Sequence, residues 1–423
     1  MANNLTKNIQ EKIANTFIDG YEADMVTLDT IDRSTIPQGS INNTSGTTFQ
    51  VKRPHQWKTA RTSGGDLTAV TKSDIISATA TARVQDYFSE IVEWTQVEEA
   101  LQLNSLDTIL APIAQKIGND CESDFNEYML QNSAHQLGDP TLSVDRWSDV
   151  AQISTFAKDI GMPAGKLYGQ VTPDTRQKLA DAQIGLFSDS LIKSAYHSAM
   201  IPKDFGGAEV FSSNSLVNFQ SGTTLAGTLK VNGAVTQTYI AGKDTYQTTM
   251  TIDGFTSATG TIVAGTVIQL PGTLWNQQQT KRAAAGVNGA GRAFTAVVAA
   301  DATISGNQVT VTLNGPAFFE ATGNYNTIAS AIANDDDVNI ISGAEGANNV
   351  PNLFYHRKAF GYLSVKLPKL HSIDSTIVNF KGMSFRIHKF SDGLTNQQLI
   401  RFDFLPAYVT YNPLLAGRFF GNA

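Results

Sequence analysis

The chain has 423 residues and a formal net charge of −7, from 31 lysines and arginines against 38 aspartates and glutamates. This acidic balance argues against a protein whose main task is to grip nucleic acid, because neutralising phosphates requires clustered Lys and Arg. The single cysteine, Cys121, excludes an intrachain disulfide framework, and the length is sufficient for two or three hydrophobic cores.

The N-terminal region carries polar and charged residues without an apolar run. We therefore expect no signal peptide and no transmembrane span, and a protein made and assembled in the cytoplasm. Leu5, Ile9, Ile13 and Phe17 recur every four residues, which predicts a short amphipathic helix. This helix is either part of an arm that reaches another partner or packs on its own domain.

Residues 47–95 predict a long hairpin-like loop. Two β-like stretches, 49–58 and 74–92, bracket a polar tip at 61–66 that contains two glycines. Its basic residues are Lys52, Arg53, Lys58 and Arg61. A histidine and a tryptophan lie between them, which is also typical of nucleic-acid contact. A protein partner is favoured, because the patch is short and the whole chain is acidic.

The strongest helical pattern lies at 105–133, where apolar residues follow the 3.6-residue period. Pro112 predicts a bend or a later start, so the straight part is expected to begin near that residue. Shorter helices are predicted at 146–160, at 173–183 with Thr172 as N-cap, and at 189–200.

Residues 221–350 form a compositional insertion. They hold 21 Thr and 16 Gly but only 13 charged residues, whereas most of the chain's charge lies in the flanking segments. The alternation at 246–253 and at 309–313 predicts β-strands, and further short runs between turn residues bring the total to about six. Such spacing is typical of a small closed β-barrel.

After the insertion, 353–367, 384–390 and 399–410 predict strands, so the flanking segments are α+β. Enzyme motifs are missing: the sequence contains no phosphate loop, HExxH, G-x-S-x-G elbow or dinucleotide fingerprint. The histidines lack ligand spacing, and Cys121 lies on the apolar face of the long helix. We therefore predict no enzyme, no catalytic residue, no cofactor and no metal site.

Several sequence blocks carry a resemblance to a known family. They are 49–56 (FQVKRPHQ), 147–152 (WSDVAQ), 179–183 (LADAQ), 351–355 (PNLFY), 367–374 (LPKLHSID), 401–408 (RFDFLPAY) and 419–422 (FFGN). With this order of elements, the chain resembles the major capsid proteins of tailed phages with the Hong Kong 97 fold. More narrowly, it resembles the P22-type coat proteins of short-tailed phages, which carry an inserted β-barrel at this point.

The resemblance implies an α+β, Hong Kong 97-like fold. It divides the chain into an N-terminal arm (1–46), an extended β loop (47–95), a peripheral domain with the spine helix (96–145), a first axial segment (146–220), the inserted β-barrel (221–350) and an axial and peripheral β return (351–423). The basic loop residues would meet acidic groups of a neighbouring subunit. The turn at 241–245, with Lys243 and Asp244, is our candidate for contact between capsomers.

The function that the resemblance implies is a major capsid protein. It would self-assemble, as hexamers and pentamers, into an icosahedral virion shell around double-stranded DNA, first as a procapsid that later expands. The implied partners are other copies of the chain, a scaffolding protein, a portal protein and weakly bound DNA, with no membrane. The alternative from another class is a β-rich carbohydrate- or cell-surface-binding protein, which the Thr- and Gly-rich insertion suggests.

Overall fold

The computed structural model describes residues 26–31, 48–57, 59–68, 70, 73, 75–95, 106–184, 204–286, 289–321, 323–369, 375–380, 383–392 and 397–422. The predicted N-terminal helix and the helix predicted at 189–200 lie outside these residues. The chain divides into two compact units. The first is Met1–Val51, Thr81–Phe125 and Phe360–Val409, and the second is Lys52–Ala80, Asn126–Ala359 and Thr410–Ala423.

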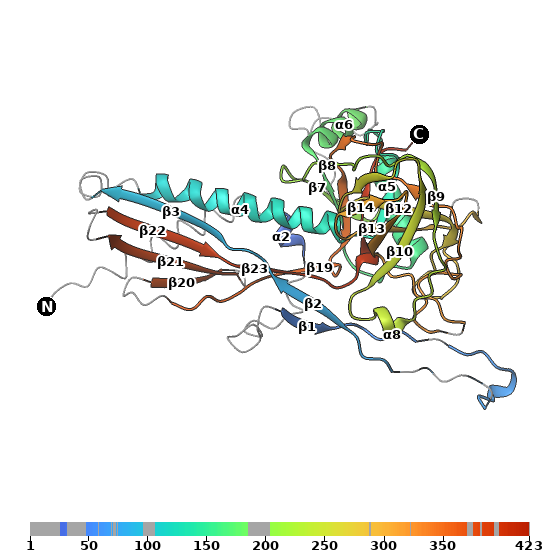
Figure 1. Cartoon of the computed structure of the whole chain (residues 1–423). Helices are drawn as coiled ribbons and strands as arrows, with labels where there is room; N and C mark the ends of the chain where they lie inside the picture. The colour runs from blue at the N-terminus through green and yellow to red at the C-terminus, as the bar shows by residue number, and fades with distance from the viewer. Residues whose placement is uncertain are drawn as a thin grey trace. The chain divides into compact units, whose positions relative to one another are not determined.

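The first unit combines two four-stranded sheets with most of the long helix α4 (Leu106–Gln131). One sheet has the order β1-β2-β23-β19, and the other has the order β20-β21-β22-β3 (Figure 1). The bounds are α2 Thr27–Thr30, β1 Thr48–Lys52, β2 Thr79–Val84, β3 Phe88–Thr95, β19 Phe360–Ser364, β20 Ser375–Phe380, β21 Met383–Asp392, β22 Gln397–Phe404 and β23 Pro406–Thr410.

The core of the first unit centres on Phe125 of α4, which is fully buried. Its ring meets those of Tyr362 and Tyr408 edge to face, with centroids 5.3 and 5.1 Å away. Asp403 of β22 is also buried and accepts bonds of 2.6 Å from both Arg386 Nη2 and Arg401 Nε. These bonds give the buried carboxylate the charged partners that it needs in a low-dielectric site.

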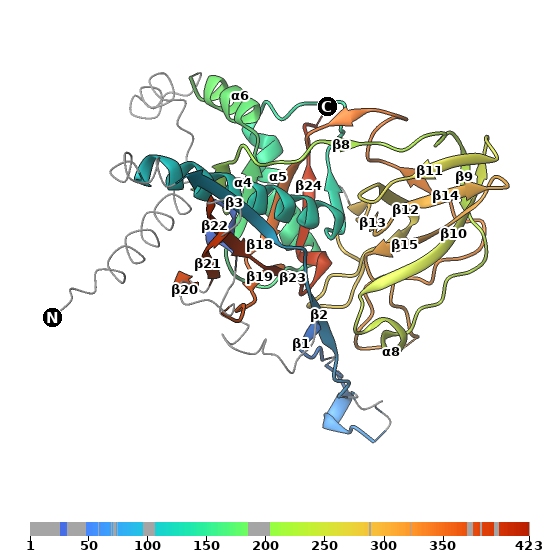
Figure 2. The same ribbon diagram turned by 60° about the vertical axis from the view of Figure 1, so that its left-hand side comes forward.

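The second unit contains a six-stranded mixed sheet in the order β4-β24-β18-β5-β7-β6. Its elements outside the insertion are η1 Ser63–Gly65, β4 His135–Leu137, α5 Trp147–Ile160, β5 Leu167–Val171, α6 Pro173–Ile184, β6 Asp204–Phe205, β7 Ala208–Ser212, β8 Phe219–Gln220, β18 Asn352–His356, η4 Pro413–Leu415 and β24 Ala416–Phe419. The C-terminal strand β24 lies between β4 and β18, so residues distant in sequence complete this sheet (Figure 2).

The inserted segment forms a second sheet in the order β16-β12-β13-β15-β10-β9. Its bounds are β9 Gly227–Val231, α8 Tyr239–Gly242, β10 Gln247–Phe255, β11 Thr259–Ile262, β12 Val267–Leu274, β13 Ala293–Val298, β14 Ala302–Ser305, β15 Val309–Asn314, β16 Asn339–Ile340 and β17 Asn348–Asn349. The residues before β16 also bond to β9, since Val231 N donates to Asp336 O and Val338 N donates to Leu229 O. These backbone bonds close the sheet, which leaves few free edges.

The flanking sheet and the insertion are joined within the second unit at helix ends. Asn314 Nδ2 donates to Gln131 O at the end of α4 over 2.8 Å. Arg292 donates twice to Asp159 of α5, over 2.7 and 3.0 Å. Gln278 N donates to Ile160 O, which is also in the last turn of α5. Asn314 and Gln278 of the insertion thus bind carbonyls that a helix leaves without internal partners, and Arg292 binds a side-chain carboxylate.

The helix predictions are confirmed for α5 and α6, and Thr172 Oγ1 accepts from Thr175 N over 3.1 Å as the predicted N-cap of α6. The long helix predicted at 105–133 is confirmed by α4, which begins at Leu106 and continues through Pro112, so a later start at this proline is wrong. Proline lacks an N–H and removes one intrahelical bond, but the bonds on either side of it can keep a long helix continuous.

The alternation predicted within the insertion is confirmed. Thr248, Met250 and Ile252 of β10 are buried, as are Val309, Val311 and Leu313 of β15. Two predicted single strands are each two strands: 353–367 contains β18 and β19, and 399–410 contains β22 and β23, which lie in different sheets. Periodicity did not reveal these breaks, because the connecting residues, such as Ala359 and Leu405, are themselves apolar and buried.

Candidate functional site

The loop between β1 and β2 begins at Arg53, whose side chain is buried in the second unit. Arg53 Nη1 donates to Tyr411 O, Nε donates to Thr79 O over 3.3 Å, and Nη2 donates to Asp244 O over 3.3 Å. Its guanidinium carbon lies 3.7 Å from the centroid of the Tyr246 ring. Burial lowers the pKa of Arg53 below its usual value, although the surrounding tyrosines and Asp244 oppose this shift.

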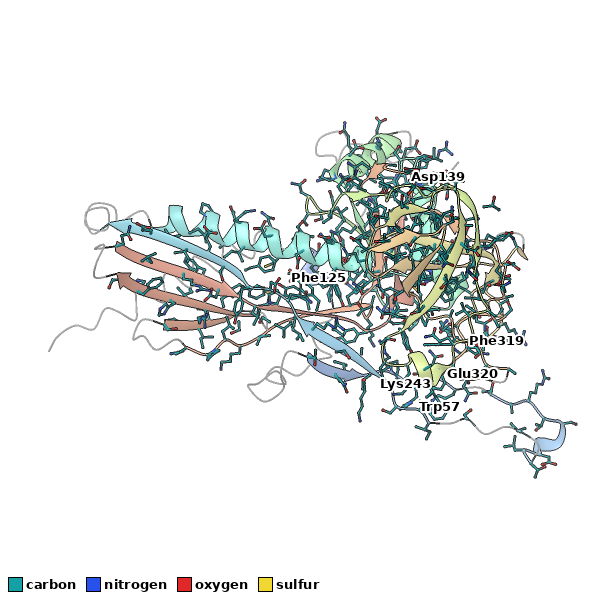
Figure 3. All side chains as sticks on the ribbon, viewed as in Figure 1. Trp57, Phe125, Asp139, Lys243, Phe319 and Glu320 are labelled. Atoms are coloured by element: carbon teal, nitrogen blue, oxygen red, sulfur yellow. The ribbon has the colours of Figure 1, made fainter. Side chains whose placement is uncertain are left out.

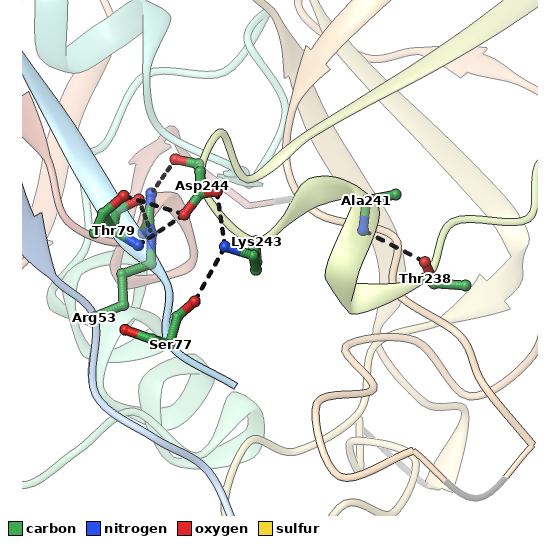
Figure 4. Close-up of polar contacts among 7 residues, drawn as sticks. All are labelled: Arg53, Ser77, Thr79, Thr238, Ala241, Lys243 and Asp244. Atoms are coloured by element: carbon green, nitrogen blue, oxygen red, sulfur yellow. Dashed lines mark hydrogen bonds and ion pairs between the residues drawn. The ribbon is translucent and has the colours of Figure 1, made fainter. Parts of the chain in front are cut away.

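Lys243 and Asp244 follow the short helix α8 and bind the returning side of the same loop (Figure 4). Lys243 Nζ donates to Asp244 Oδ2 over 2.9 Å and to Ser77 O over 3.0 Å. Asp244 Oδ1 accepts from Thr79 N over 2.9 Å and from Thr79 Oγ1 over 3.1 Å. Desolvation alone would raise the Asp244 pKa, but the bonds from Lys243 and Thr79 outweigh it and hold the pKa below its usual range.

The loop also contributes a residue to an aromatic cluster of the insertion. Ala78 is buried together with Tyr239, Tyr246, Phe318 and Tyr325 of the insertion. The Tyr239 and Tyr325 rings stack with centroids 3.8 Å apart, and Phe318 meets Tyr239 edge to face at 5.4 Å. Aromatic packing and buried hydrogen bonds therefore hold the base of the loop against the insertion.

A second tether lies on the outgoing side of the loop. Lys281 Nζ donates to Gln56 Oε1 and, over 3.5 Å, to Asn326 O. Burial lowers the pKa of Lys281 to about 8, so at neutral pH it is mostly protonated and able to donate both bonds. Together with Arg53, Lys243 and Asp244, this contact holds both sides of the loop against the insertion at the base of the loop.

Beyond this base the loop presents apolar side chains to solvent. Trp57 is 57 % exposed, Leu67 is 60 % exposed and Ile75 is 73 % exposed. The loop runs out past α8 to the turn η1 (Figures 1 and 2), and Figure 3 labels Lys243 at its base and Trp57 next to the base. Gly64 and Gly65 adopt φ of 76° and 75° there, a region that favours glycine. Single exposed apolar side chains are common on protein surfaces, but three of them on one loop with an anchored base make this loop the candidate interaction element.

The structure separates the predicted contact residues into different environments. Lys52 and Arg61 are exposed, and Lys58 lies outside the described residues. Arg53 is only 7 % exposed and binds its own chain, so it differs from the predicted exposed pairing with a neighbour. Lys243 and Asp244 likewise contact the loop of the same chain. Sequence reasoning could not reveal this, because the partners Thr79 and Tyr411 carry no recognisable signal.

The predicted loop is confirmed in its pairing and is wrong in the lengths of its strands. β1 and β2 are neighbours in one sheet, and Arg53 N donates to Ala78 O over 2.8 Å just beyond them. β1 ends at Lys52 instead of residue 58, and the second stretch divides into β2 and β3. β3 leaves the loop and joins β22 in the other sheet of the first unit.

Within the described ranges, no group of three or more His, Cys, Asp or Glu side chains is arranged to hold a metal ion. Over the same part of the chain, no helix combines the length and apolarity needed to cross a membrane.

Comparison with known proteins identifies the family. The model described as "P22 coat protein - gene protein 5" matches residues 1–421. The chain belongs to this family of phage coat proteins. A major capsid protein of Acyrthosiphon pisum secondary endosymbiont phage 1 is 41% identical over 428 residues, which cover 100% of both chains. The protein is therefore a phage major capsid protein, a structural component of the virion that forms the capsid shell with further copies of itself.

Solved phage structures also match over most of the chain. The capsid of Cyanophage P-SCSP1u is similar at 12% identity with a TM-score of 0.44, covering 94% of this chain and 89% of that one. A structure of Mycobacterium phage Che8 is similar at 10% identity with a TM-score of 0.46, covering 94% and 91%. The α+β class predicted from the sequence is confirmed by the helices and strands described above, and family membership carries the Hong Kong 97-like architecture with it.

Proposed function

We propose that the chain assembles its shell through the anchored loop between β1 and β2, which lies over a neighbouring copy. The observation that supports this proposal is the combination of an exposed apolar outer part, with Trp57, Leu67 and Ile75, and a buried base at Arg53. A loop held in one conformation before association loses less conformational entropy on binding. Each subunit would contribute one such contact, and the strength of the shell would come from its repetition.

In this proposal Lys243 and Asp244 act on subunit contacts indirectly. Their bonds to Ser77 and Thr79 would set the direction in which the loop leaves the insertion. Exposed ion pairs contribute only about 0 to 1 kcal/mol each. The pair would therefore matter for geometry more than for binding energy.

Assembly is proposed to begin in the host cytoplasm on a scaffolding protein, with a portal protein at one vertex. The procapsid would then expand as double-stranded DNA is packaged. The net charge of −7 supports a container that does not grip the phosphate backbone. The division into arm, loop, peripheral and axial segments and inserted barrel supplies the parts for this process.

Expression of the full chain with and without the scaffolding protein of its phage tests this function. Negative-stain electron microscopy with sedimentation should give uniform closed shells when scaffolding protein is present and irregular or few shells without it. Equal yields of uniform shells in both cases would exclude scaffold dependence, although the coat function would stand. Monomers alone under both conditions would overturn the assembly proposal.

The Lys243→Ala and Asp244→Ala double variant tests the proposed role of the loop base. We expect a folded subunit with a lower yield or more irregular shells, because the loop would leave the insertion at variable angles. The matched control is Lys230→Ala with Asp337→Ala, an exposed ion pair of 3.0 Å elsewhere on the insertion. Unchanged shell yield and regularity in the loop-base variant would contradict the proposed role.

A further inference from the structure

The sequence contains three asparagines that are directly followed by glycine: Asn232, Asn288 and Asn314. Asparagine is a chemically labile residue, because the backbone nitrogen of the next residue can attack its side-chain amide carbon. A glycine in that next place has no side chain to shield the nitrogen and leaves the backbone free to bend. The fold decides which of these asparagines can react. Asn288 lies outside the described residues, so the structure compares the other two.

Asn232 and Gly233 directly follow β9, and both are exposed. Gly233 adopts a φ of 88°, and no atom of the described residues lies within 4 Å of the place where a Cβ would be added to it. Asn232 Nδ2 donates an exposed bond to Gln308 Oε1 over 3.1 Å. Water can replace such a bond at little cost, so the side chain of Asn232 is free to approach the nitrogen of Gly233.

Asn314 and Gly315 have the opposite surroundings. Asn314 is 7 % exposed, its Nδ2 donates to Gln131 O over 2.8 Å, and its Oδ1 accepts from Gln247 Nε2 over 2.8 Å. A Cβ added to Gly315 would lie 2.6 Å from Ala296 Cβ, so the backbone here is closely packed as well. A reaction of Asn314 with the next nitrogen would require the local structure to open first.

The nitrogen of Gly233 is itself restrained by a side chain. It donates to Asn334 Oδ1 over 2.7 Å. Asn334 Nδ2 donates to Asp335 Oδ2 over 2.8 Å, which orients the amide with its oxygen towards Gly233. The nitrogen must lose its proton before it attacks, so this bond opposes the reaction. Because Asn334 is exposed, water competes for the same proton and the bond opens readily.

We propose that Asn232 is a site of spontaneous deamidation, with water as the reagent. Hydroxide removes the proton from Gly233 N, and this nitrogen forms a bond to Asn232 Cγ. The bond from Cγ to Nδ2 breaks, and Nδ2 leaves as ammonia after taking a proton from water. Water then opens the cyclic imide at either of its carbonyls, which gives aspartate or isoaspartate at residue 232. Each conversion consumes one water and releases one ammonia.

Both products change the edge of the inserted sheet. An aspartate side chain has no donor for Gln308 Oε1, and it adds a negative charge to a chain whose net charge is −7. Isoaspartate lengthens the main chain between Val231, whose N donates to Asp336 O, and Gly233. The bond from Val231 helps to close the sheet, so conversion weakens this closure. A shell that repeats the subunit many times accumulates the change as it ages.

The test follows the full-length chain by peptide mapping with mass spectrometry, at neutral and at mildly alkaline pH. In the folded chain, Asn232 should convert at least about tenfold faster than Asn314, because Asn314 reacts only after local opening. In urea, which removes this protection, the two should convert at similar rates. Alkaline pH should accelerate the conversion of Asn232, since hydroxide starts the reaction. Equal rates in the folded chain, or an intact Asn232 after the unfolded chain has converted, would overturn the proposal.

Two substitutions at exposed positions test the restraint and the consequence separately. Asn334→Ala should accelerate the conversion of Asn232, because it frees the proton of Gly233 N, and an unchanged or slower rate would contradict the restraining role of this bond. Asn232→Gln is the unreactive control, since glutamine would have to form a larger ring. On ageing, the midpoint of urea unfolding should fall for the native chain and stay constant for Asn232→Gln. Equal midpoints despite conversion would show that residue 232 does not affect closure of the sheet.

Discussion

At the scale of single residues, buried charged and titratable side chains make the stability of the second unit sensitive to single substitutions and to pH. Arg53 donates hydrogen bonds to three backbone carbonyls, those of Thr79, Asp244 and Tyr411. Lysine keeps the charge but has one nitrogen, which cannot reach acceptors spread across the plane of a guanidinium group. The identity of this basic residue, and not only its charge, therefore matters.

We expect Arg53→Lys to lower the free energy of unfolding by about 2 to 3 kcal/mol, because buried carbonyls lose a charged donor. Urea unfolding followed by circular dichroism measures this change. The control is Lys52→Gln at the neighbouring exposed residue, which should change stability by less than about 0.5 kcal/mol. Equal effects of the two substitutions would contradict a structural role that is specific to Arg53.

His135 is a base that is buried in its neutral form. Its Nε2 lies 3.2 Å from Leu414 O and its Nδ1 lies 3.3 Å from Thr295 Oγ1, and burial lowers its pKa from 6.5 to about 3. Between pH 3 and pH 6.5, His135 binds a proton in the unfolded chain but not in the folded chain. Stability should therefore be fully present above pH 6.5 and fall as the pH decreases towards 3.

The expected loss is about 1.4 kcal/mol per pH unit within that range. Other groups titrate there too, so the quantity to measure is the difference between the native chain and His135→Gln, which cannot take up a proton. Denaturant unfolding at several pH values should give a difference that shrinks as the pH falls. A difference independent of pH would mean that the folded chain binds this proton.

At the scale of elements, the loop between β1 and β2 and the helix α4 carry the clearest consequences. Leu67→Ser with Ile75→Ser should leave subunit stability within about 0.5 kcal/mol, because both side chains are exposed in the isolated chain. The same change should reduce the yield of shells, as measured by sedimentation. Val350→Ser, at another exposed apolar position, serves as the control. Full shell yield from the double variant would exclude these side chains from assembly.

Pro112 lies inside α4 and is exposed, so burial against the described residues does not require its ring. Replacement by alanine supplies the missing N–H and a residue of high helix propensity, which should stabilise the subunit by about 1 to 2 kcal/mol. The midpoint of urea unfolding should rise with an unchanged slope. Gln115→Ala, at an exposed position one turn later, should give a much smaller change. A destabilised Pro112→Ala chain would indicate that the helix needs the proline.

At the scale of the whole molecule, assembly brings together many copies that each carry a net charge of −7. Like net charges repel, and salt screens this repulsion over about 10 Å at 0.1 M ionic strength. Shell formation, followed by light scattering, should therefore accelerate as the concentration of a monovalent salt is raised. A slower rate in higher salt would mean that local attraction between opposite charges dominates association.

The amino-acid sequence by itself determined the α+β class, the inserted β-rich segment, the alternation of β10 and β15, and the helices α5 and α6 with the Thr172 cap. These features follow from local periodicity and capping, which neighbouring residues encode. The family was also readable from sequence blocks. Only the tertiary structure decided that Arg53, Lys243 and Asp244 bind their own chain, because their partners lie far away in sequence. The position of β24 between β4 and β18 depends on the same kind of long-range contact, for which periodicity carries no signal.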